Sequence, residues 1–257
     1  MERKVAGALV QSLWLRDRRG GPWFPPAHLK HTPVAFEGNT GARIAGTWFP
    51  ADKPRGAVVL AHPDKRYAKH WFVKEGYVEL LLSEGYDVLT FDFTGYGESH
   101  GPATYYHEDL LAAARFADHW AGGFPIHVLG VSMGAFAAAN ASPHLDFVRT
   151  LILESPYPSF NAWYAKGASK LAIEAFDALF PATGRAIKAD ANIARAAPTR
   201  ILIASSTRDE VTPPALTKRV ADAAPADRTR VHELDAPHLG FLQDPNYREA
   251  MLATLAA

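Results

Sequence analysis

Cysteine is the most informative absence from this sequence. The 257 residues contain none, so disulfide bonds, catalysis by a thiol and metal sites built on cysteine are excluded. An excess of charge of one sign is also lacking, because 27 lysines and arginines balance 27 aspartates and glutamates. This balance favours neither a nucleic acid nor an anionic membrane as a partner.

Long hydrophobic runs are lacking too, and no segment approaches the length of a membrane span. Residues 1–10 have the charge and apolar order of a short signal peptide. However, Gln11 and Ser12 interrupt the apolar run, and arginines follow it in place of a small-residue cleavage site. We expect residues 1–31 to form an N-terminal helix and an extended lead-in. We expect a soluble, cytoplasmic protein, with surface association or export as the alternatives.

The remaining sequence has the pattern of one α/β domain, residues 32–257. Two strand-like runs, 32–36 and 42–49, are joined by turn residues and predict a β-hairpin at the edge of a sheet. From Arg55 onward, apolar runs alternate with segments of helical length. This alternation predicts a mainly parallel sheet with helices on both faces.

Several elements can be placed within this pattern. Residues 71–84 are expected to form one helix that ends at Gly85, and Thr212 is expected to be the N-cap of another. The other expected helices are 104–120 and 246–255, and the expected strands are 56–61, 87–91, 126–129, 147–153, 200–204 and 230–234. An aromatic-rich insertion at about 157–197 interrupts the alternation, and we interpret it as a helical cap over a site. Two extra helices packed on the core are a compatible alternative.

The stretch Gly130-Val131-Ser132-Met133-Gly134 lies where a predicted strand becomes a predicted helix. A turn this sharp strains the central residue, and glycines two positions before and after it relieve the crowding that a Cβ would cause. The turn lifts the Ser132 hydroxyl out of the sheet and directs the first amides of the helix toward whatever that hydroxyl attacks. Ser132 is therefore the candidate nucleophile.

A serine nucleophile needs a histidine base, and the histidine needs a carboxylate. Such groups gather at the carboxyl ends of parallel strands. Asp209 follows the predicted strand 200–204, and His238 follows the predicted strand 230–234. These positions predict a Ser132, Asp209 and His238 triad.

Other residues compete for these roles. Glu210 is the alternative acid, but adjacent loop residues point differently and only one can reach the imidazole. His232 lies within a predicted strand, where packing or solvent contact is expected. Asp235 and Glu154 are candidate supporting carboxylates, but loop solvation is the favoured explanation for both. No metal site is expected: His28 and His31 have a suitable spacing, but no third ligand lies nearby in the sequence.

Two backbone amides are needed to stabilise a tetrahedral oxyanion. Met133, directly after the nucleophile, supplies the first. The loop beginning at His62 should supply the second, and because Pro63 has no N–H, we assign it to Asp64. The Asp64 carboxylate would oppose an oxyanion unless it turns away or is paired, by Lys65 or Arg66.

The ordered serine, acid and histidine resemble those of the α/β-hydrolase superfamily. The segment from Asp92 to Ser99 matches the Asp-x-x-Gly-x-Gly-x-Ser loop of that superfamily, and Asp209-Glu210-Val211-Thr212-Pro213 resembles its acid loop. The Leu153-Glu154-Ser155-Pro156 stretch and the modest insertion resemble the branch of monoacylglycerol lipase-like and BEM46-like serine hydrolases. Two departures are His62-Pro63 in place of His-Gly, and Pro237-His238 in place of Gly-His. Neither removes a group that catalysis requires.

The resemblance implies an α/β-hydrolase fold and no cofactor or metal. The hypothesis is a serine hydrolase that cleaves carboxylic esters or thioesters of a small-molecule acyl substrate through an acyl-Ser132 intermediate. Within enzymes, the alternatives are hydrolases of small peptides, lactones or carbon–carbon bonds. The alternative from another class is a non-catalytic protein that binds a small ligand on the same scaffold.

Overall fold

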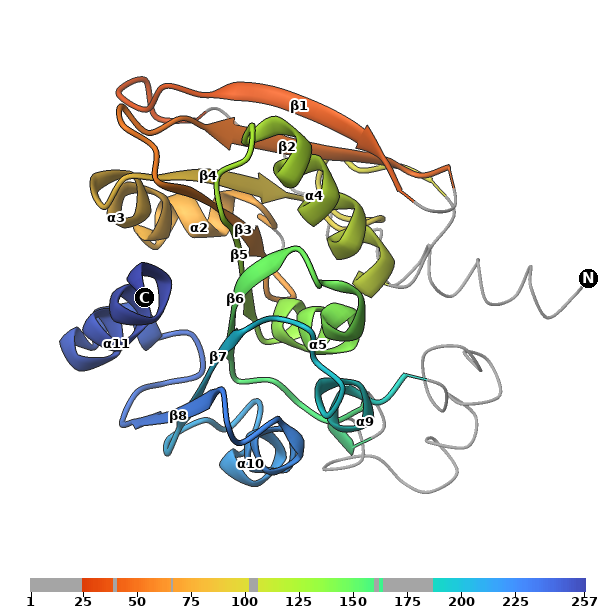
Figure 1. Cartoon of the computed structure of the whole chain (residues 1–257), viewed down its shortest axis with the longest axis vertical. Helices are drawn as coiled ribbons and strands as arrows, with labels where there is room; N and C mark the ends of the chain where they lie inside the picture. Colours follow the sequence, from red (N-terminus) through yellow and green to blue (C-terminus); the bar gives the residue numbers. More distant parts are fainter. Residues whose placement is uncertain (1–24, 39–40, 66, 102–105, 160–161, 164–186) are drawn as a thin grey trace, which may run out of the picture.

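The computed structural model describes residues 25–257, apart from 39–40, 66, 102–105, 160–161 and 164–186. One eight-stranded sheet runs through these residues in the order β1-β2-β4-β3-β5-β6-β7-β8 (Figure 1). The strands are β1 (Thr32–Glu37), β2 (Arg43–Phe49), β3 (Gly56–Ala61), β4 (Tyr86–Phe91), β5 (Ile126–Val131), β6 (Val148–Glu154), β7 (Arg200–Ser206) and β8 (Thr229–Leu234). Each expected strand is present, with ends that lie within two residues of expectation.

The sheet is antiparallel at one edge and parallel elsewhere. β1 and β2 form the expected hairpin, and β2 pairs antiparallel with β4. All further pairs, from β3 with β4 to β7 with β8, are parallel. From β3 the chain goes first to β4 on one side and then to β5 on the other, which creates a topological switch point between β3 and β5. Ligands of open α/β sheets bind at the carboxyl ends of the strands at such a point.

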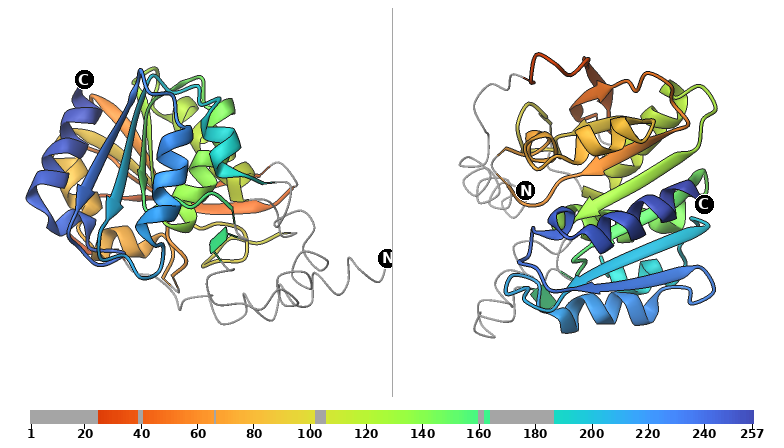
Figure 2. Two further views of the ribbon diagram at one scale, coloured as in Figure 1. Left: turned by 90° about the horizontal axis from the view of Figure 1, so that it is seen from below. Right: turned by 90° about the vertical axis from the view of Figure 1, so that its left-hand side faces the viewer.

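Helices cover both faces of the sheet, as Figures 1 and 2 show, so the expected α/β architecture is confirmed. The helices among the described residues are α2 (His70–Lys74), α3 (Tyr77–Ser83), α4 (Tyr106–Trp120), α5 (Met133–Ala141), η1 (Ser142–His144), α9 (Ala189–Ile193), α10 (Pro214–Ala223), η2 (Phe241–Gln243) and α11 (Pro245–Ala256). Alternate strand residues face opposite cores: Val59 belongs to the core that includes residues of α4, α5, α9 and α10, and Val58 to the core that includes residues of α2, α3 and α11. The central strands are apolar throughout because both faces are covered.

The single helix expected over residues 71–84 is wrong, because the chain forms two short helices there. Helix α2 ends at Lys74 and α3 begins at Tyr77. Gly76 lies between them with φ of 85°, a left-handed conformation that stops the first helix and that glycine adopts without a Cβ penalty. Gly85 follows α3 with φ of 77°, as expected for a residue just beyond a helix.

The expected N-cap at Thr212 is also wrong. Helix α10 starts at Pro214, its N-cap is Pro213, and no side chain caps it. The physical reason lies in the preceding loop, where the Thr212 N–H donates to Asp209 Oδ1 at 2.7 Å. This bond holds Thr212 in the acid loop, so the helix begins later.

The expected N-terminal helix falls outside the described residues, as does most of the expected cap over about 157–197. Of the lead-in, residues 25–31 are described, and His31 Nδ1 lies 2.9 Å from the carbonyl oxygen of Leu29. Among the described residues, no cluster of three or more histidines and carboxylates could hold a metal ion. The helices found there are all too short or too polar to cross a membrane.

Candidate active site

Ser132 lies in the turn between β5 and α5, at the carboxyl end of a central strand. Its φ of 53° and ψ of −110° are the strained conformation that the sequence predicted for the centre of this turn. The flanking glycines are needed because the turn is tightly packed. A Cβ at Gly134 would overlap the carbonyl oxygen of Ala61, and a Cβ at Gly130 would lie 2.5 Å from the carbonyl oxygen of Gly134.

The structure brings Ser132, Asp209 and His238 together from the ends of three strands. His238 Nε2 lies 2.9 Å from Ser132 Oγ, and His238 Nδ1 lies 2.7 Å from Asp209 Oδ2. With Nδ1 protonated and donating to the carboxylate, Nε2 is free to accept the serine proton. The geometry is that of a nucleophile, a base and an orienting acid.

Asp209 is held by four hydrogen bonds. Oδ2 accepts from His238 and from the Ser155 hydroxyl at 2.6 Å, and Oδ1 accepts from the backbone N–H groups of Val211 and Thr212. Burial alone would raise the pKa of Asp209, but the hydrogen bonds from His238, Ser155 and Thr212 outweigh burial and hold the pKa below its usual value. The carboxylate therefore stays ionised and fixed in orientation.

Ser155 is a site residue whose role the sequence analysis did not identify. It follows β6, is fully buried, and has φ of 49°. Its N–H donates to the carbonyl oxygen of Ala204 on β7, which places its hydroxyl next to Asp209. The stretch Glu154-Ser155-Pro156 at a strand end was visible in the sequence, but nothing in it shows which carboxylate the hydroxyl would contact.

The competing residues lie apart from this arrangement. Glu210 is exposed. Asp235 is exposed and pairs with Arg208, with 2.6 Å between Nε and Oδ1. The ring of His232 packs against that of Tyr247, with 5.7 Å between centroids.

The expectation that Glu154 is solvated in a loop is wrong, because its side chain is fully buried and the residue pairs with Val131 of β5. Its carbonyl oxygen accepts from the Ser132 N–H, and its carboxyl group accepts from the hydroxyls of Tyr77 and Tyr247 at 2.7 and 2.6 Å. Burial raises the pKa of Glu154 to about 7, against the two tyrosine hydrogen bonds, which lower it. Glu154 thus joins β6 to α3 and α11 beneath the site.

This buried carboxyl group should make stability depend on pH. At pH values below the pKa of Glu154 in the unfolded chain, the protonated side chain contributes its full stabilisation of the folded state. This stabilisation is lost as the pH rises through the folded-state pKa of about 7. We therefore expect the melting temperature to fall by several degrees between about pH 5 and pH 8, from a loss of up to about 3 kcal/mol. Glu154→Gln should flatten this slope in calorimetry. The exposed Glu249→Gln should keep it, and an equal slope in both variants would contradict the assignment.

The predicted oxyanion donors lie at the start of α5 and in the loop after β3. Met133 is the first residue of α5, where backbone N–H groups have no acceptor within the helix. The loop packs directly on α5, since a Cβ at Gly134 would lie 2.9 Å from the carbonyl oxygen of His62. The Asp64 carboxylate is bonded by Tyr96, whose hydroxyl donates to Oδ1 at 2.7 Å. Of the partners expected for Asp64, Arg66 lies outside the described residues.

His62 fixes the path of this loop. Its Nδ1 lies 2.8 Å from the carbonyl oxygen of Pro63, and its Nε2 accepts from the N–H of Phe93 at 3.1 Å. Burial lowers the pKa of His62, so the ring is neutral and bonds as one donor and one acceptor. His62 is a structural residue of the loop.

Hydrogen bonds between its own residues hold the Asp-x-x-Gly-x-Gly-x-Ser segment, residues 92–99, in a compact loop. Asp92 Oδ1 accepts from the N–H of Lys69 and Oδ2 from the N–H of Glu98, while the Ser99 hydroxyl donates to the Asp92 carbonyl oxygen. A Cβ at Gly97 would overlap the Asp92 carboxylate. The motif therefore shapes a loop beside the site.

Aromatic rings and a pocket border the candidate triad. Phe136, one helical turn after Ser132, stacks on Tyr157 at 4.7 Å, and Tyr157 on Trp163 at 5.9 Å. His238 lines a pocket of about 760 Å³ together with Lys65 and Leu239, among others. The pocket thus lies beside His238, and its lining mixes apolar with charged side chains.

Comparison with known proteins identifies the family. Residues 52–192, just over half of the chain, match the family model Hydrolase_4, described as serine aminopeptidase, S33. No curated protein sequence matches the chain.

Solved structures of similar fold include several esterases. The esterase Pf2001 of Pyrococcus furiosus is 22% identical with a TM-score of 0.72, covering 93% of this chain and 94% of that one. Acetyl xylan esterase 1 from Thermoanaerobacterium sp. JW/SL YS485 is 15% identical with a TM-score of 0.67, covering 97% and 92%. The esterase domain of a Rhodothermus marinus protein is 21% identical with a TM-score of 0.63, covering 88% and 96%. At these identities the likeness shows a shared fold, and the expected α/β-hydrolase fold is confirmed. Because the family model matches more than half of the chain, the chain belongs to the Hydrolase_4 (serine aminopeptidase, S33) family of α/β-hydrolases.

Proposed function

We propose that this hydrolase cleaves carboxylic esters or thioesters of small acyl substrates through an acyl-Ser132 intermediate. The observation that supports this most directly is the hydrogen-bonded chain from Ser132 through His238 to Asp209, at 2.9 and 2.7 Å. The esterases among the similar folds agree with it. The stacked rings of Phe136, Tyr157 and Trp163 begin one helical turn after Ser132, and apolar surroundings of this kind suit an apolar acyl group.

The reaction proceeds in two halves. In acylation, Ser132 Oγ attacks the carbonyl carbon while His238 Nε2 takes the serine proton, and the amides of Met133 and Asp64 stabilise the oxyanion. The tetrahedral intermediate collapses, and His238 returns the proton to the departing alkoxide or thiolate. In deacylation, His238 takes a proton from water, which attacks the acyl carbon to form a second tetrahedral intermediate. As that intermediate collapses, the acid is released and His238 returns the proton to Ser132 Oγ. Asp209 stays ionised and stabilises the imidazolium.

A direct test combines covalent labelling with turnover. We expect a fluorophosphonate probe to modify Ser132 stoichiometrically, as located by peptide mass spectrometry, and p-nitrophenyl esters of increasing acyl length to be hydrolysed. Folded protein that is neither labelled nor active would contradict the proposal. Saturable binding of a small apolar ligand without an adduct would instead indicate a binding protein.

The description of the matched family favours a second candidate, a peptidase that acts on small peptides. Amide and ester hydrolysis use the same serine, acid and histidine, so the site geometry accommodates both. Aminoacyl p-nitroanilides compared with p-nitrophenyl esters separate the candidates. Faster turnover of the anilides by kcat/KM would favour the peptidase.

The hydrogen bond between Ser155 and Asp209 predicts a positioning role. Ser155→Ala should lower kcat roughly tenfold with little change in KM, the loss expected for one hydrogen bond to a charged group. Because the pKa of Asp209 should rise when this bond is lost, the acid limb of the kcat/KM profile should move to higher pH. Steady-state kinetics across pH measures both effects.

Two further variants separate this role from a general packing effect. Ser155→Gly also lacks the hydroxyl but accepts φ of 49° freely, so it should lose as much activity. Ser142→Ala removes another buried hydroxyl, which donates to the carbonyl oxygen of Ala139 away from the candidate triad, and should leave the pH profile unchanged. Unaltered kinetics in both Ser155 variants would overturn the role.

A further inference from the structure

Three polar side chains form a row at the end of the sheet opposite the candidate active site. His127 of β5 is in register with Thr150 of β6, and Thr150 with Arg200 of β7. Neighbouring parallel strands lie about 4.8 Å apart, and residues in register point to the same face. Leu129, Ile152 and Leu202, two positions further along, face α3 and α11, so the row lies on that face as well.

Each side chain in this row has a buried polar atom without a hydrogen-bond partner in the described part of the chain. These atoms are His127 Nδ1, Thr150 Oγ1 and Arg200 Nη1. The side chains of His127 and Thr150 are 2% and 0% exposed. A buried polar atom without a partner costs on the order of 1–3 kcal/mol, so three on adjacent strands mark a place where a bound group would gain hydrogen bonds. All three can donate a hydrogen bond, which favours an acceptor-rich ligand.

Three arginines act on the row, and Glu84 pairs with one of them. Burial, followed by Arg149, Arg200 and Arg55, lowers the pKa of His127 to about 4. Arg149 Nη2 donates to the carbonyl oxygen of Ala257 at 2.9 Å. Each arginine keeps its charge at any pH at which the protein is folded, so an anion would be attracted here.

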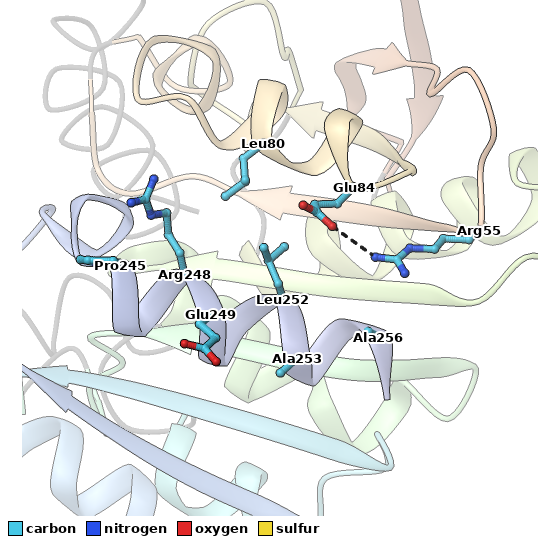
Figure 3. Close-up of a pocket in the computed structure, with 9 residues that line it drawn as sticks. All are labelled: Arg55, Leu80, Glu84, Pro245, Arg248, Glu249, Leu252, Ala253 and Ala256. Carbon is cyan, nitrogen blue, oxygen red and sulfur yellow. Dashed lines mark ion pairs between the residues drawn. The ribbon is translucent and has the colours of Figure 1, made fainter.

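Arg55 connects the row to an open groove. Its guanidinium lies 4.6 Å from the centroid of Tyr86, whose ring contacts that of His127 at 5.5 Å, and it pairs with Glu84 at 3.7 Å. Figure 3 shows Arg55 and Glu84 at one end of the groove between α3 and α11, which measures about 620 Å³. Ala256, also in this lining, precedes the residue that Arg149 contacts. The groove thus brings a ligand to Arg55, next to the Tyr86 ring that contacts His127.

We propose that Arg55, His127, Arg149, Thr150 and Arg200, named here the basal cluster, bind a small tetrahedral oxyanion of the phosphate or sulfate type. The oxyanion accepts hydrogen bonds from the three donors of the row and is attracted by the arginines. The five steps along the chain from His127 to Ser132 span about 16 Å of strand, so the basal cluster is separate from the triad. The proposal is therefore independent of the function proposed above.

Thermal unfolding with added anions tests this site. Inorganic phosphate at 20 mM should raise the melting temperature of the wild-type protein by a few degrees relative to chloride of equal ionic strength. Arg200→Gln and Thr150→Val should lose the phosphate-specific shift. Arg230→Gln, an exposed arginine on the adjacent strand β8, should keep it and corrects for the general stabilising effect of phosphate.

A second measurement tests the proposal even if the Arg200→Gln protein does not fold. Phosphate should raise the pKa of His127 in an NMR titration, because an anion nearby favours the imidazolium, and sulfate should do the same. No shift in the wild-type melting temperature, or equal shifts in the wild-type, Thr150→Val and Arg230→Gln proteins, would overturn the proposal. So would a His127 pKa that phosphate leaves unchanged.

Discussion

Replacement of Ser132 by alanine should lower ester turnover by about 10⁴-fold or more, to the level of the uncatalysed reaction plus binding effects. The Ser132 hydroxyl is the atom from which His238 Nε2, 2.9 Å away, would take a proton, and alanine has no atom to replace it. Rates of p-nitrophenyl ester hydrolysis and labelling by a fluorophosphonate measure the effect.

The fold should tolerate this change. Alanine meets the same backbone strain at φ of 53° as serine, and the hydrogen bond that is lost faces a partly open site. The melting temperature should therefore change by no more than a degree or two. Ser83→Ala, at an exposed serine of α3, should keep full activity. Residual activity above about 1% in Ser132→Ala, or a large loss of stability, would point to a structural serine and another nucleophile.

Replacement of Gly134 by alanine should destabilise the protein by about 3 kcal/mol or more. Its Cβ would overlap the carbonyl oxygen of Ala61 and lie 2.9 Å from that of His62, and both are backbone atoms that cannot rotate away. Helix α5 must then move away from β3, which also displaces Met133 and the loop that contains Asp64. Denaturant unfolding should show the loss of stability, and ester hydrolysis should fall with it.

Gly38→Ala is the matched control for this prediction. A Cβ at Gly38 would meet its neighbours at 3.5 Å, an ordinary contact distance, and this glycine has no positive φ. We expect a change within about 0.5 kcal/mol there. A Gly134→Ala protein as stable and active as the Gly38→Ala protein would show that the contact between α5 and β3 is not needed.

The sequence predicted the sheet well because both faces are covered and the central strands are apolar throughout. It failed where the signal is local and weak. The helix predicted over residues 71–84 is interrupted at Gly76, which serves both the end of α2 and the start of α3. An isolated glycine in a helical pattern does not by itself distinguish a tolerated residue from a break.

The residues of the candidate site also divide into those that the sequence predicted and those that it could not assign. Ser132, Asp209 and His238 could be selected because each follows a strand, and parallel strands end at one edge of the sheet. Ser155 and Glu154 could not be assigned, because their contacts depend on how β6 lies between β5 and β7. The Ser155 hydroxyl reaches Asp209 at 2.6 Å across 54 positions of sequence, and Glu154 meets tyrosines from α3 and α11.

The sequence alone determined the alternation of strands and helices, the sharp turn at Ser132 and the order of its candidate partners, because these follow from periodicity and local backbone preference. Only the tertiary structure decided which hydroxyl supports the Asp209 carboxylate, which side chains hold Glu154, and which polar side chains gather at the far end of the sheet. Such contacts join strands that are distant in the chain, and their distances are set by register and packing, which no local pattern encodes.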